Sequence, residues 1–96
     1  MDITKCNEVF EINGTTDRYI VNGIADRDLS GHLNIDFRFS NLDEIELGNG
    51  WYNEYPENNY SDFGVSGSDE NRIKLIEFAN EVIDFVIEHF KSINYL

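Results

Sequence analysis

The sequence has one cysteine, one proline and one methionine, and only 7 Lys and Arg residues against 19 Asp and Glu. Because Cys6 is alone, no intrachain disulfide can form, and nothing indicates an oxidising compartment. The first residues show no basic segment followed by an apolar run, so we expect no secretory signal. No apolar run approaches the length of a membrane span. We therefore expect a cytoplasmic protein that does not enter membranes.

Recognisable catalytic motifs are also missing from the sequence. His32 and His89 share no spacing with Cys6 or with a serine motif, and there is no phosphate-binding glycine loop or nucleophile elbow. Carboxylates are plentiful, but acid–base catalysis needs one carboxyl group with a raised pKa inside a pocket, which a sequence does not show. We therefore expect a protein that is not an enzyme and that carries no cofactor.

The residues that are present predict one α+β domain over residues 1–96, because 41% of the chain is hydrophobic and this length supports a single core. Apolar and polar residues alternate strictly between residues 32 and 40, which predicts a strand with one solvated face. Asn13-Gly14 is a strong signal for a hairpin turn between two earlier strands. The expected strands are 8–12, 18–25, 32–40 and a short one at 43–47.

A helix is expected over roughly residues 69–93, with Ser68 as its N-cap and Asp69 and Glu70 in its first turn. Apolar residues recur at helical spacing in a stripe wider than one covering sheet requires, so we expect a second cover. The aromatic segment before the helix, or a second copy of the chain, would supply it. The predicted fold is a four-stranded antiparallel meander with one long C-terminal helix packed across one face.

Acidic residues dominate the surface chemistry, and the formal net charge is −12. At 100° per residue, four carboxylates fall on one narrow face of the predicted helix: Glu77, Glu81, Asp84 and Glu88. Neighbours in this acidic row lie about 4–6 Å apart along the helix axis. Charges on a nucleic-acid strand are spaced by about 3.4 Å, so the row would imitate a row of phosphates. The alternative is an ordinary solvated helix face.

Residues 48–68 show no clear period, and a long loop without regular structure in a compact domain commonly has a function. Within it, residues 51–63 form an aromatic–acidic segment in which Trp and Tyr alternate with carboxylates. Rigid rings give contact area at a low entropic cost, and carboxylates select Arg and Lys. The alternative is that the rings close the core beneath a loop.

One turn resembles the first part of an EF-hand calcium loop. Oxygen-bearing side chains stand at its first, third, fifth and ninth positions: Asp26, Asp28, Ser30 and Asn34. Gly31 occupies the sixth position, but Phe37 stands where the bidentate Glu belongs. These four residues are weak metal candidates, and we expect no bound metal, because Asp, Ser and Gly also favour ordinary polar turns.

Together these features predict a small acidic inhibitor that blocks a nucleic-acid-handling protein by presenting carboxylates and aromatic rings to its basic groove. DNA-mimic proteins, including phage anti-CRISPR proteins, and bacterial immunity proteins that neutralise nuclease toxins use this strategy. The partner would be a basic, nucleic-acid-binding protein, while nucleic acid itself and anionic membranes would repel the chain. The predicted contact residues are Trp51, Tyr52, Glu54, Tyr55, Glu57, Tyr60, Glu77, Glu81, Asp84 and Glu88.

Two alternatives to an inhibitor remain open from the sequence. The first is a non-enzymatic assembly module that uses the apolar helix face, including a homodimer. The second is a domain stabilised by calcium at the turn.

Overall fold

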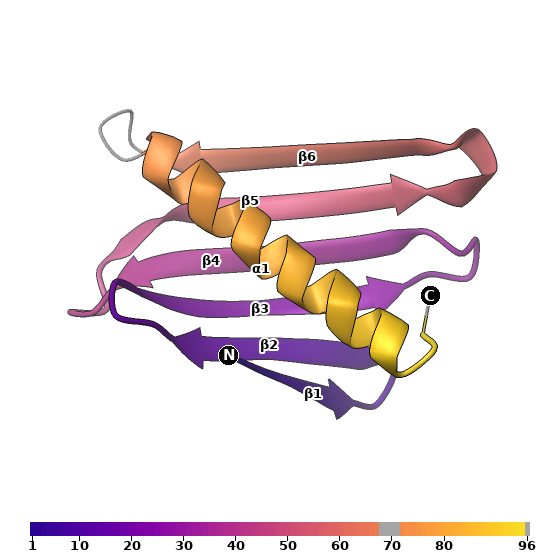
Figure 1. Cartoon of the computed structure of the whole chain (residues 1–96), viewed down its shortest axis with the longest axis horizontal. Helices are drawn as coiled ribbons and strands as arrows, with labels where there is room; N and C mark the ends of the chain where they lie inside the picture. The colour runs from indigo at the N-terminus through magenta and orange to yellow at the C-terminus, as the bar shows by residue number, and fades with distance from the viewer. Residues whose placement is uncertain (68–71, 96) are drawn as a thin grey trace.

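A six-stranded antiparallel sheet and one helix make up the computed structural model, in which residues 1–67 and 72–95 are described (Figure 1). The strands are β1 (Asp2–Cys6), β2 (Val9–Thr15), β3 (Tyr19–Arg27), β4 (Leu33–Asn41), β5 (Glu46–Tyr55) and β6 (Tyr60–Gly67). They lie side by side in the order of the sequence. A 3-10 turn, Pro56–Asn58, joins β5 to β6, and the helix α1 (Arg72–Ser92) crosses one face of the sheet diagonally (Figure 1).

The predicted α+β class, an antiparallel sheet with one C-terminal helix, is confirmed, but the number of strands is wrong. The sheet has six strands rather than four. β1 was not expected, and residues 48–67, which were expected to belong to a loop, form most of β5 and all of β6. β1 gave no signal because it is an edge strand in which only Ile3 is half-buried. Its sequence therefore lacks the alternation that burial of one face imposes.

The predicted turn at Asn13-Gly14 is also wrong. Both residues lie inside β2, where Asn13 pairs with Asn22 and Gly14 with Val21. The chain turns three residues later, where the Thr16 hydroxyl accepts hydrogen bonds from the backbone amides of Arg18 and Tyr19. The expected N-cap Ser68, with Asp69 and Glu70, lies outside the described residues.

The core lies between α1 and one face of the sheet. Alternate residues of β4 are buried at 0–2% exposure against the helix, as the period-2 pattern predicted: Leu33, Ile35, Phe37 and Phe39. From the helix, Phe90 is fully buried and makes edge contacts with Phe10 and Tyr95, at ring-centroid distances of 4.9 and 4.7 Å. The apolar face of the helix is therefore covered by the sheet.

The expected second cover over α1 is not the aromatic–acidic segment, which belongs to β5, β6 and their turn. Ile73 and Phe85 are the large apolar side chains of α1 that remain exposed, at 75% and 43%. The opposite face of the sheet, which we call the open face, is not covered by the helix (Figure 1). No helix among residues 1–67 and 72–95 is long and apolar enough to cross a membrane.

Candidate functional site

The acidic row lies on the outer face of α1. The core residues of the helix repeat at three- and four-residue spacing, and the four carboxylates fall on the side opposite to them. All four are exposed. Glu88 forms an exposed ion pair with Lys91 at 3.6 Å, which is a weak interaction in water. Within residues 1–67 and 72–95, the other three carboxylates form no ion pair, so their charge is available to a partner.

The predicted aromatic contact residues do not share one surface. The pairing of Trp51 with Asp36 and of Tyr55 with Tyr60 places these rings on the open face, away from α1. Tyr52 pairs with Ile35, so it lies on the helix side, where its hydroxyl donates a 2.9 Å hydrogen bond to Glu54. Burial and this bond raise the pKa of Tyr52. The predicted site is therefore divided between both faces of the sheet and the outer face of α1.

Trp51 has a fixed place on the open face. Its cross-strand partner in β6 is Gly64, and the six-membered ring of Trp51 occupies the space that a side chain at position 64 would need. A tryptophan ring laid against a glycine of the neighbouring strand stabilises the pair and restricts the ring. Trp51 remains partly exposed, so it offers a rigid aromatic wall.

No family model matches this chain, and neither does any curated protein or solved structure.

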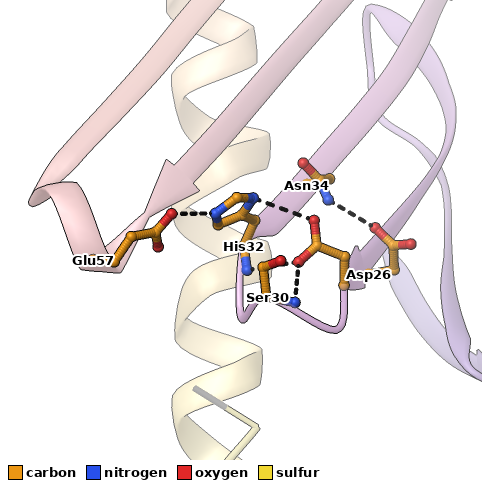
Figure 2. A network of polar contacts seen from close by, with 6 residues as sticks. Asp26, Ser30, His32, Asn34 and Glu57 are labelled. Carbon is orange, nitrogen blue, oxygen red and sulfur yellow. Dashed lines mark hydrogen bonds and ion pairs between the residues drawn. The ribbon is translucent and has the colours of Figure 1, made fainter.

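The best-defined polar cluster joins the turn between β3 and β4 to the turn between β5 and β6. His32 hydrogen-bonds through Nε2 to the carboxylate of Glu57 (Figure 2), and its Nδ1 lies 3.3 Å from Oδ2 of Asp28. The His32 ring also meets the Tyr55 ring edge-on at 4.8 Å, and Tyr55 stacks on Tyr60 at 5.8 Å. We call His32, Asp28 and Glu57 the His32 clasp.

The clasp changes the proton affinity of all three members. The hydrogen bond to Glu57 raises the pKa of His32, although burial opposes it, and Asp28 adds to the rise. The same bond lowers the pKa of Glu57. Burial acts to raise the pKa of Asp28, but hydrogen bonds from the backbone amides of His32 and Ser30 lower it overall. The clasp is therefore held best with a charged imidazolium between two carboxylates.

We expect the clasp to contribute most stability between pH 4.5 and 6.5. A raised pKa means that the His32 contribution is complete below its ordinary value of 6.5 and is lost as pH rises through the folded-state value. The Glu57 contribution is complete above 4.5 and is lost as pH falls through its lowered value. Urea unfolding of the wild type and His32→Gln, at about pH 5.5 and about pH 8.5, should show the larger difference at the acidic pH.

The variant Glu57→Gln tests whether the bond between His32 and Glu57 causes this pH dependence. In Glu57→Gln, the His32 imidazolium loses its main partner, so the effect of His32→Gln should vary less between the two pH values. An equal effect of His32→Gln at both pH values in the wild-type background would show that the clasp does not titrate as described.

The turn that resembles a calcium loop uses its carboxylate for other bonds. Oδ1 of Asp28 accepts hydrogen bonds from the backbone amides of Ser30 (2.9 Å) and His32 (3.0 Å), and Oδ2 faces the imidazole. Asp26 and Asn34 lie on the adjacent strands, where the Asn34 amide points to the Asp26 carboxylate at 3.4 Å (Figure 2). The described residues contain no cluster of three or more His, Cys, Asp or Glu side chains arranged for a metal ion.

Sequence reasoning placed His32 on a solvated strand face but gave it no role. The alternation around it was a usable signal for its orientation. Its partners Glu57 and Tyr55 were assigned to a loop, so their position opposite His32 was not foreseeable. The register between β4 and β5 pairs Leu33 with Glu54, and the 3-10 turn that follows β5 carries Glu57, so the neighbouring residues meet at this end of the sheet.

Proposed function

We propose that the chain is a small acidic inhibitor that acts in the cytoplasm by binding a basic protein that handles nucleic acid. The observation that supports this most directly is the acidic row, four exposed carboxylates that lie along residues 77–88 of α1. Among the described residues, the row has one ion pair, between Glu88 and Lys91. A rigid helix holds these charges at fixed spacing, as a nucleic-acid strand holds its phosphates. The inhibitor would occupy the partner's basic groove and exclude the nucleic acid.

The net charge of −12 supports the same function through the rate of association. A strong field of one sign steers a partner of the opposite sign and raises the association rate, and this effect falls steeply with ionic strength. Binding through the row should therefore weaken as salt shortens the screening length from about 10 Å at 0.1 M. An assembly module that uses apolar contacts would bind with little dependence on salt.

The acidic row is tested by reversing its two central charges. The double variant Glu81→Lys with Asp84→Lys should abolish capture of a basic protein from source cells at about 0.1 M salt. In the wild type all four charges of the row attract a basic partner, whereas in the variant two attract it and two repel it. Both positions are exposed, so the helix should stay folded, which circular dichroism checks. The wild type should release the same partner at about 0.5 M salt.

The matched control is a double reversal away from the helix. Asp43→Lys with Glu46→Lys changes the net charge equally and affects two exposed residues at the connection between β4 and β5. Capture by this control with loss in the row variant locates the interface on α1. Equal loss of capture in both variants would show that binding depends on net charge and not on the position of the charges. Unchanged capture by the row variant would show that the acidic row is not part of the interface.

A further inference from the structure

A shallow groove of about 500 Å³ crosses the open face from β2 to β5. Two cross-strand rows of side chains line it. One row holds two carboxylates, an isoleucine and a tryptophan, in the order Glu11, Ile24, Asp36 and Trp51. The other holds three amides and a guanidinium, in the order Asn13, Asn22, Arg38 and Asn49.

The first row fits a long cationic side chain. Ile24 is 50% exposed and lies between Glu11 and Asp36 in the row, so an apolar patch separates two carboxylates. Directly opposed residues in a sheet are about 5 Å apart. The carbon stem of an arginine or lysine can cover Ile24 while its charged head meets a carboxylate. Asp36 also neighbours the wall formed by Trp51, and an aromatic face beside a carboxylate is a favourable place for a guanidinium.

The second row fits the backbone of an extended peptide. Arg38 and the three asparagines supply hydrogen-bond donors that peptide carbonyl groups accept, and the asparagines also supply acceptors for peptide N–H groups. Within residues 1–67 and 72–95, Arg38, Glu11 and Asp36 form no ion pair. Four strands at about 4.8 Å spacing give a groove about 14 Å long, which matches about four residues of extended chain.

We propose that this groove binds an extended arginine- or lysine-bearing peptide segment, with the cation between Asp36 and Trp51 and the peptide carbonyls along the row of Arg38. The inference rests on the proposed function, because it assigns the segment to the same basic partner. Charge complementarity supports the choice of occupant, since a chain of net charge −12 concentrates cations at its surface. The groove would add a sequence-specific contact on the face opposite to the acidic row.

Trp51 is the single tryptophan of the chain, so its fluorescence reports on the groove directly. The probe is the blocked tetrapeptide acetyl-Arg-Ala-Arg-Ala-amide, titrated into the purified full chain. The control peptide carries citrulline in place of both arginines, which keeps the shape and removes the charge. A saturable change of Trp51 fluorescence with the arginine peptide, and its loss with the citrulline peptide, is the expected result. Equal responses to both peptides would overturn a cation site.

Two neutralising variants locate the site. Asp36→Asn should weaken binding of the arginine peptide by roughly tenfold or more, because a charge-assisted hydrogen bond is lost. Asp62→Asn is the control, because it removes one negative charge from the open face at a position in β6 that lies outside the groove. It should change the affinity for the arginine peptide by less than about twofold. Equal weakening in both variants would show diffuse attraction and overturn the groove.

The proposed function and the groove fail separately in this design. Glu81→Lys with Asp84→Lys lies on α1, so this variant should bind the arginine peptide as the wild type does, whether or not it captures a partner. Loss of peptide binding in that variant would overturn the groove as the site. A saturable fluorescence change with cellotriose and none with the arginine peptide would also overturn the proposal and assign the groove to a carbohydrate.

Discussion

Replacement of Phe90 by alanine should lower the free energy of unfolding by about 3–5 kcal/mol. Phe90 is fully buried and its ring contacts Phe10 and Tyr95, so the change removes a large apolar surface and two aromatic contacts. A domain of this kind has about 5–15 kcal/mol of stability in total. Each kcal/mol lowers the Tm by about 4–8 °C at this size, so thermal unfolding followed by circular dichroism should show a shift of tens of degrees.

Phe85→Ala is the matched control, because it makes the same substitution five residues earlier in the same helix. Phe85 is 43% exposed, so its loss should cost about 1 kcal/mol or less. If Phe90→Ala does not fold, Phe90→Leu keeps most of the apolar volume and should cost less than about 1.5 kcal/mol. Similar losses for Phe85→Ala and Phe90→Ala would contradict the packing of α1 described above.

Replacement of Gly23 by valine should also destabilise the chain, although valine favours strands and glycine does not. A Cβ atom at position 23 would collide with the carbonyl oxygen of Asp36 and lie 2.6 Å from Cβ of Phe37. The two central strands would have to separate, and overpacking of this kind costs about 1–3 kcal/mol. Urea unfolding should therefore show a lower midpoint for Gly23→Val than for the wild type.

Asn22→Val is the control for strand propensity, because Asn22 is the adjacent residue of β3 and its side chain is exposed on the open face. Its substitution should be neutral or slightly stabilising, within about 0.5 kcal/mol. A stabilising Gly23→Val would show that β3 and β4 are not as close as the structure places them.

The sequence predicted those helices and strands whose own residues show an uninterrupted alternation or helical spacing of apolar side chains. β4 alternates apolar and polar residues without a break, and α1 repeats apolar residues at three- and four-residue spacing, so both were predicted. β5 and β6 were missed because glycines occupy positions that face the core, where apolar side chains would have given an alternating pattern. The space above Gly50 is filled by Phe37, and the space beside Gly67 by Leu75. The apolar group at these places comes from another element, which local periodicity does not reveal.

The candidate site was also predictable only where it depends on the spacing of residues within one element. The acidic row depends only on helical spacing, so its placement on one exposed face followed from the sequence. The His32 clasp and the groove depend on register across strands, which places Tyr55 beside His32 and Trp51 opposite Asp36. A shift of one residue would move each of these side chains to the other face of the sheet. Composition and periodicity do not fix that register when the turns are misplaced.

The order of strands along the sheet has a consequence for how the chain reaches its native state. Every strand pairs with its sequence neighbour, so the sheet forms through a series of short loop closures, which favours rapid folding for a β-rich chain. The contact between Phe10 and Phe90 cannot form until α1 has been synthesised and has docked. Before that point the growing chain exposes the apolar face of the sheet in addition to its two edge strands, β1 and β6, and this is the form most exposed to aggregation. The time between completion of the hairpins and docking of α1 should therefore determine the yield of soluble chain.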